Sequence, residues 1–155
     1  MYKLLGLLVA ALCLATATFA QSPKGMNKNE SNQKVLVAYF SATGNTARAA
    51  QKIAAATGGD LYAITPAQPY NEADLDWRNE KSRSSVEMNN PKARPALGGN
   101  APDISSYDVI FIGYPIWWDL APRIILTFIE SKDWQGKTVI PFATSGSSSI
   151  SNSAT

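Results

Sequence analysis

The sequence predicts an open α/β fold with a parallel, doubly wound sheet. Short apolar runs lack alternating polar positions, which is typical of strands covered on both faces by helices. Helical patterns separate these runs, so successive strands need crossover connections and lie parallel. With 155 residues, 45% of them hydrophobic, the chain suits one domain with a sizeable core.

Four apolar runs predict the strands. Two of them, 35–40 and 109–114, are rich in β-branched and aromatic residues. The other two are 61–64 and 139–143. Each run is short enough for a strand and too short for an average helix.

Two segments show helical spacing. In residues 45–57, small and apolar side chains such as Ala50 and Ile53 recur on one face, and Gly58 follows. In residues 122–131 the apolar positions include Ile125 and Phe128, after a proline suited to the first turn. Each segment therefore predicts the crossover helix between two strands.

A long polar connection lies between Thr65 and Tyr107 and holds five of the nine prolines. Residues 72–89 are compatible with a helix, and 91–102 with an irregular loop. Because connections of this length are usually functional or carry their own structure, we expect a helix and a loop that covers part of a site. The alternative is a surface insertion without function.

Residues 1–20 resemble a secretory signal: Lys3, an apolar run at 4–17, and then Thr18-Phe19-Ala20. The run is short for a bilayer span, which disfavours the alternative of an uncleaved anchor. We expect cleavage after residue 20, a polar tether at 21–33, and a domain at 34–155. The mature chain is then exported, periplasmic or secreted, with no stable membrane anchor.

Composition excludes several kinds of chemistry. The chain has no histidine, and its one cysteine, Cys13, lies in the predicted signal. This removes Ser-His-Asp and Cys-His nucleophiles and histidine or thiolate metal sites. Loss of residues 1–20 takes Lys3 from 14 basic residues and leaves 12 acidic ones, a net charge of +1. Nucleic acid is therefore disfavoured as a partner, and any redox chemistry belongs to a bound cofactor.

The loop after the first predicted strand has the character of a phosphate site. It combines hydroxyls and an amide with a glycine for a tight turn, and it precedes a helix whose first N–H groups favour an anion. Its residues are Ser41, Ala42, Thr43, Gly44, Asn45 and Thr46. Neither a Gly-Lys-Ser/Thr phosphate loop nor a dinucleotide glycine pattern is present, so we expect a monophosphate. The alternative is a cap that only starts the helix.

Two further loops follow the third and fourth predicted strands. Adjacent indoles suit stacking on a planar heteroaromatic ring; the alternative is that they pack under the long connection or at an interface. Small residues after the last strand let backbone amides approach a ligand; the alternative is a plain serine-rich loop. The ends of parallel strands meet at one edge of a sheet, so the three loops should converge. The two loops contribute Pro115, Ile116, Trp117, Trp118, Thr144, Ser145, Gly146, Ser147 and Ser148.

These three loops together make residues 34–155 resemble the flavodoxin-like family, in particular its group with a long loop after the second strand. The resemblance implies strand order 2-1-3-4-5 and a flavin mononucleotide (FMN) site. It implies that residues 41–46 hold the phosphate, and that 115–118 and 144–148 flank the isoalloxazine. The chain departs from the family in lacking strong acidity and in having Asp119 where relatives often have glycine. Relative to the family, a last strand and two helices are missing after Thr155, so we expect a fragment with apolar surface open on the sheet and on the edge of the fourth strand.

The resemblance implies an FMN-binding electron-transfer protein whose partner is a redox protein or a small-molecule acceptor. An FMN-dependent reductase of quinones or similar acceptors is the alternative from the enzyme class, and the sequence does not decide between carrier and oxidoreductase. A third hypothesis is a binding module that has kept the fold and lost the flavin. No side chain stands out as a catalytic acid or base.

Overall fold

A computed structural model of the chain describes residues 33–154. The predicted signal, residues 1–20, and all of the predicted tether except Gln33 lie outside the described residues. Within residues 33–154, no helix has the length and apolar character needed to cross a bilayer.

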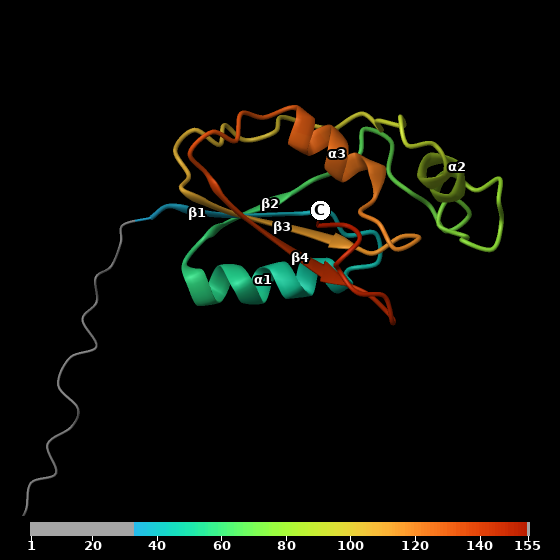
Figure 1. The fold of residues 1–155 in the computed structure, drawn as a ribbon, viewed down its shortest axis with the longest axis horizontal. Coiled ribbons are helices and arrows are strands. Elements are labelled where there is room, and N and C mark those ends of the chain that lie inside the picture. Colours follow the sequence, from blue (N-terminus) through green and yellow to red (C-terminus); the bar gives the residue numbers. More distant parts are fainter. Residues whose placement is uncertain (1–32, 155) are drawn as a thin grey trace, which may run out of the picture. The chain divides into compact units, whose positions relative to one another are not determined.

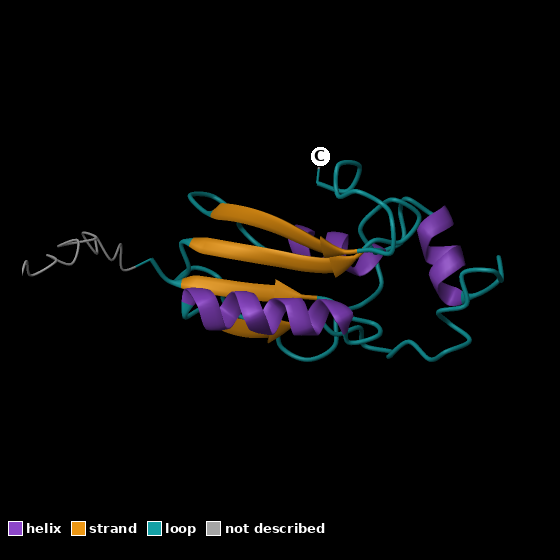
Figure 2. Cartoon of the chain, turned by 90° about the horizontal axis from the view of Figure 1, so that it is seen from below, coloured by secondary structure: helices purple, strands orange, loops and turns teal. Residues whose placement is uncertain are grey.

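The described strands form one parallel sheet in the order β2-β1-β3-β4 (Figure 2). They are β1 (Val35–Tyr39), β2 (Asp60–Ala63), β3 (Val109–Pro115) and β4 (Thr138–Thr144). Every neighbouring pair is parallel. The predicted fold class and the order of the first four strands are confirmed, and the predicted strand ends differ by one residue.

Two helices cover opposite faces of the sheet (Figure 1). Helix α1 (Asn45–Thr57) has the predicted bounds, and α3 (Arg123–Glu130) is one residue shorter at each end than predicted. A third helix, α2 (Arg83–Asn89), lies in the long connection beyond the carboxyl ends of the strands. The helix expected within residues 72–89 is therefore present, although it has only two turns.

The core is built on the two central strands. Leu36 of β1 and Ile110 of β3 are buried, and Phe128 of α3 packs in the same cluster. On the other face, Val37 meets Ala50 of α1. The prediction that the strands are covered on both faces is wrong for β2, an edge strand of the described sheet, where Leu61 is 46% exposed. On β4, at the other edge, Val139 is 41% and Ile140 37% exposed, which is the open apolar surface expected there.

One glycine in the sheet is required by close packing. Gly113 of β3 lies between Tyr39 of β1 and Phe142 of β4. The Phe142 ring occupies the place of a side chain there: an added Cβ would lie 2.1 Å from its Cζ atom. The glycine thus lets an aromatic ring cover the middle of the sheet.

We expect Gly113→Ala to lower the free energy of unfolding by about 1–3 kcal/mol, because the methyl group overpacks this contact. Chemical denaturation measures the change. The control is the same substitution in a Phe142→Ala background, where the ring is gone and the cost should be much smaller. Equal costs in both backgrounds would contradict this explanation.

Candidate functional site

The three predicted loops meet at the carboxyl edge of the sheet. The Thr46 and Thr144 hydroxyls lie 2.8 Å apart and join the first loop to the third. The backbone N–H of Ile116 donates to the Thr144 carbonyl over 2.9 Å and joins the second loop to the third. Ser148 also hydrogen-bonds the Asp119 carboxylate. Loops that are far apart in the sequence therefore form one connected surface.

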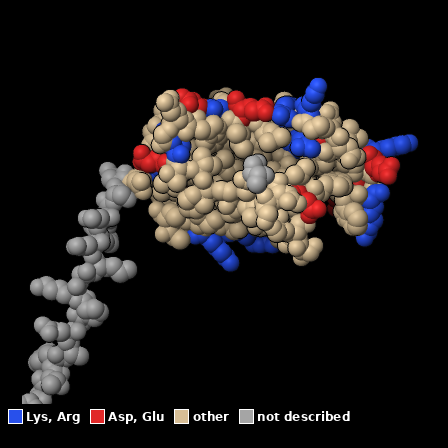
Figure 3. Space-filling view, in the orientation of Figure 1, with Lys and Arg blue, Asp and Glu red and all other residues tan. Residues whose placement is uncertain are grey.

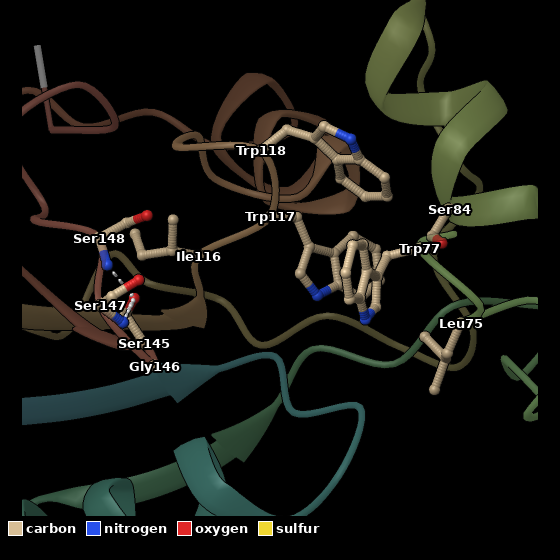
Figure 4. A pocket seen from close by; sticks show the side chains of 10 residues that line it. All are labelled: Leu75, Trp77, Ser84, Ile116, Trp117, Trp118, Ser145, Gly146, Ser147 and Ser148. Carbon is tan, nitrogen blue, oxygen red and sulfur yellow. Dashed lines mark hydrogen bonds between the residues drawn. The ribbon is translucent and has the colours of Figure 1, made fainter. Parts of the chain in front are cut away.

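This surface holds two adjoining cavities. The hydroxyl cavity, of about 460 Å³, is lined by Thr43 and Asn45 of the first loop, with Pro115 and Thr144. The indole cavity, of about 480 Å³, is lined by residues 116–118 and 145–148 and by part of the long connection (Figure 4). Both cavities share four residues, Ile116, Trp117, Ser145 and Gly146, so one elongated ligand can occupy both.

The start of α1 is open to an anion. Its N-cap residue is Gly44, at φ +86°, and no side chain caps the helix. The Ser41 hydroxyl accepts from the Gly44 N–H over 3.1 Å instead. In α2, by contrast, the Ser82 side chain caps the Ser85 N–H. The alternative that the first loop only caps the helix does not describe α1, whose N-cap residue has no side-chain cap. The first-turn amides of α1 and its helix dipole both favour negative charge.

A cation stands beside this loop. The guanidinium of Arg48, one turn into α1, donates to the Asn45 side-chain oxygen. Its Nη1 atom would lie 3.7 Å from a Cβ placed on Gly44. Arg48 was not predicted as part of the site, because it lies outside the loop in the sequence. Its side chain reaches the loop because a residue in the first turns of a helix extends back toward the helix start.

The two tryptophans of the second loop differ. The Trp117 ring packs edge-on against Phe40 and Tyr70, with centroid separations of 5.6 and 5.4 Å. Trp118 is 42% exposed. The N–H groups and carbonyls of Trp117 and Leu120 bond each other at 2.9 Å, which closes a tight turn. Of the pair, Trp118 thus offers the freer indole face to a ligand.

The third loop folds on itself. The Ser145 hydroxyl accepts from the N–H groups of Ser147 and Ser148 over 3.2 and 2.8 Å. Successive free amides were expected at this edge, but these two already have an acceptor. Ser145 is close enough to bond them because two residues with small side chains follow it.

The long connection forms one wall of the indole cavity through Leu75, Trp77 and Ser84. Its Tyr70 hydroxyl bonds the Glu87 carboxylate, which also accepts from Arg83 Nε over 2.7 Å. The Arg83 guanidinium lies 4.1 Å from the Tyr70 ring centroid. Burial and the Glu87 acceptor raise the pKa of Tyr70 well above its usual value, so this hydroxyl remains a donor that fixes the connection against Trp117.

The structure gives most of the predicted site residues a place on a cavity wall. Four of them, Ser41, Ala42, Gly44 and Thr46, line neither cavity and instead shape the first loop. Leu75, Trp77 and Ser84 line the site and were not predicted, because the polar connection around them has no periodic pattern. Two adjacent indoles after a strand gave a signal in the sequence, whereas a single indole within a polar segment did not.

Charges do not form a single-sign patch on the face seen in Figure 3, where basic and acidic side chains lie around an uncharged middle. The ten residues that line the indole cavity include no charged side chain. This cavity therefore suits an uncharged planar group better than an anion, whose charge would lose water there without gaining a partner.

A model of the flavodoxin family matches residues 34–155. The chain belongs to the flavodoxin family. A search of curated proteins found no match. Among solved structures, the chain is similar to a candidate flavoprotein from Bacteroides eggerthii, with 72% identity, coverage of 79% of this chain and 77% of that one, and a TM-score of 0.78.

A candidate flavoprotein from Bacteroides uniformis is similarly close, with 64% identity, coverage of 78% of each chain and a TM-score of 0.77. A flavoprotein from Lactobacillus acidophilus, solved in complex with FMN, has 23% identity, coverage of 78% of this chain and 80% of that one, and a TM-score of 0.62. The last likeness shows the shared fold.

Two residues of the Trp117–Leu120 turn have left-handed backbone conformations, Trp118 at φ +48° and Asp119 at φ +60°. Such conformations favour glycine at both central positions of a tight turn. The chain has neither glycine, and the Ser148 bond to Asp119 holds the turn in place. This conformation explains why a glycine at position 119 is suited to the same turn.

We expect Asp119→Gly to be more stable than Asp119→Ala by about 1 kcal/mol in free energy of unfolding. Both substitutions remove the carboxylate that Ser148 bonds, so the difference between them isolates the backbone strain. Thermal and chemical denaturation of the two variants measure it. If Asp119→Ala is as stable as Asp119→Gly, the left-handed turn is not a constraint on the folded chain.

Proposed function

We propose that the chain binds FMN with its phosphate in the hydroxyl cavity and its isoalloxazine in the indole cavity, and that it serves as an electron carrier. The observation that carries this proposal is the junction of an uncapped helix N-terminus with an uncharged aromatic cavity. FMN has two matching parts: a charged phosphate and an uncharged planar ring with polar atoms along one edge. The flavin-bound Lactobacillus neighbour and the family match support the proposal.

The phosphate half of the site fits a dianion. The Thr43 hydroxyl and Asn45 amide line the cavity, and the first-turn amides of α1 lie directly behind them. Arg48 adds a positive charge at the edge of the loop. Hydrogen bonds from neutral groups, a helix dipole and one cation together match a monophosphate, as expected for a loop without a lysine.

The ring half of the site fits isoalloxazine. Trp118 offers an exposed indole face, and Ile116 and the serine-rich third loop lie on the other side of the cavity (Figure 4). Aromatic rings gain from offset or edge contacts with such indoles in addition to the apolar area they bury. When bound, the flavin supplies the electron chemistry, while these side chains orient the ring and exclude water from it.

Two further parts of the proposal concern where the carrier works and how its partner docks. The signal-like segment at residues 1–20 supports export to the periplasm or the medium. A near-neutral charge balance supports a partner that docks mainly through contact around the ring, because strong electrostatic steering needs an excess of one sign.

An FMN-dependent reductase of small acceptors is the second candidate. It is favoured by the long connection, which builds a wall beside the proposed ring site that the three strand-end loops alone would not supply. Steady-state oxidation of a reduced nicotinamide with a quinone separates the two candidates. Turnover without any partner protein supports a reductase, and its absence in the flavin-loaded chain supports a carrier.

FMN titration of the chain, followed by flavin fluorescence, tests the site. We expect quenching on binding, and a dissociation constant raised roughly tenfold by Thr43→Ala or by Trp118→Ala, because each removes a hydrogen bond or a ring contact. Thr57→Ala, at the far end of α1, is the matched control and should bind as the wild type does. A folded wild-type chain that leaves FMN fluorescence unchanged would disprove the proposal.

The charge of Arg48 gives a second test. Arg48→Gln should weaken FMN binding roughly 3- to 10-fold at low salt and less at high salt, since exposed charges are screened. Riboflavin, which lacks the phosphate, should bind equally well to this variant and to the wild type. Lys52→Gln removes a positive charge one turn farther along α1 and serves as the control. Equal losses in the two variants would show a general charge effect and no phosphate contact.

A further inference from the structure

The long connection places an unusually exposed tryptophan at the indole cavity. Trp77 is 66% exposed, more than any other exposed large hydrophobic side chain of the described residues. It nevertheless lines the cavity together with Trp117 and Trp118, which come from the loop after β3 (Figure 4). A planar ring placed against this indole would bury apolar area of both rings, which favours the contact.

The backbone around Trp77 is held in a defined turn. Asn71 and Asp74 bond each other's backbone N–H groups through their side chains, at 2.9 and 3.0 Å. The Asp76 carboxylate accepts from the Arg78 N–H over 3.1 Å, and its carbonyl accepts from the Asn79 N–H over 3.1 Å. Trp77 therefore lies in a turn whose backbone is hydrogen-bonded on both sides of this residue.

The segment that carries this turn is fixed to the body of the domain. The buried guanidinium of Arg123, at the start of α3, donates to the Met88 carbonyl over 2.8 Å and to the Glu87 carbonyl over 3.4 Å. Arg94 makes two bonds of 2.8 and 2.7 Å to the Glu130 carboxylate at the end of α3. These contacts join the end of α2 and the loop after it to α3, and the Ser84 N–H, which donates to the Asp74 carbonyl over 2.9 Å, joins the Trp77 turn to α2.

The side chain of Trp77 also has a local support. The Arg78 guanidinium lies 4.9 Å from its ring centroid, within the range of a cation–π contact. Ser84 and Leu75 line the cavity beside it, so this wall is mostly apolar and carries no charged side chain among the lining residues. The indole N–H of Trp77 is one hydrogen-bond donor on it. Such a wall recognises a flat ring that carries polar edge atoms.

We propose that Trp77 is a ligand-contacting residue, whose indole packs against the isoalloxazine ring and covers part of it from solvent. This inference rests on the proposed function, since it takes FMN as the ligand. It assigns the long connection a direct role in recognising the ring, in addition to the three strand-end loops. The phosphate half of the site lies in the other cavity and is independent of Trp77.

The test compares FMN with riboflavin, which has the ring without the phosphate, by fluorescence titration of the full chain. Trp77→Ala should raise the dissociation constants of both ligands by a similar factor, roughly 3- to 10-fold. Trp77→Phe should restore most of the affinity because it keeps an aromatic face. Val86→Ala, which shortens another exposed side chain of the same connection outside the cavity, should leave both constants unchanged.

The outcomes are distinct. Wild-type affinity of Trp77→Ala for both ligands would overturn the role of Trp77 while Thr43→Ala and Trp118→Ala still test the site as a whole. A loss confined to FMN would also overturn it, because it would place the effect on the phosphate side. No binding of either ligand by the wild type would overturn both proposals. Far-UV circular dichroism of each variant shows whether the fold is retained. A loss in Trp77→Ala that Trp77→Phe does not restore would count against ring contact.

Discussion

Tyr39 of β1 lies beside Gly113 of β3, and Gly113 lies beside Phe142 of β4. In this parallel register the carboxyl ends of the three strands lie at nearly the same level, so the loops that follow them meet. A register shift by one residue would exchange the faces of every side chain on a strand and separate the Thr46 and Thr144 hydroxyls. The site therefore depends first on how the strands pair, and Gly113 allows that pairing to be covered by the Phe142 ring.

The two halves of the site arise from different ranges of sequence. The hydroxyl half is local: Gly44 leaves α1 uncapped, and Arg48 reaches the loop from the next turn of the same helix. The indole half is assembled over long range, from the second and third loops and from the long connection. A ligand with a charged end and a flat end matches this division, because each cavity has the chemistry of one end and they share a boundary.

The same distinction explains what the sequence could predict. The bounds of α1 were predicted correctly because a glycine stands just before its start and another just after its end. Gly44 and Gly58 both take left-handed conformations, which glycine marks in a sequence. The exposure of β2 was not predicted, because an apolar run does not reveal whether its strand lies at an edge of the sheet. The exposure of β4 was predicted, because the family fold places one more strand beside it. Trp77 was missed for a related reason: its place at the cavity depends on anchors such as Arg123, which lie far along the chain.

Those anchors also bear on how a ring could enter the cavity. The connection is held at the end of α2 by the buried Arg123 contacts. The cluster of Tyr70, Glu87 and Arg83 also holds it, because the Tyr70 ring packs edge-on against Trp117. Moving it outward would leave the carbonyls of Glu87 and Met88 and the Arg123 charge without their partners in a buried place, which costs several hydrogen bonds at once. The Trp117–Leu120 turn is held as well, by its paired backbone bonds and by the Ser148 bond to Asp119. A ring that enters the cavity therefore meets two held backbone segments. The exposed side chain of Trp118 is the part that can turn aside, because exposed side chains change rotamer without breaking buried contacts.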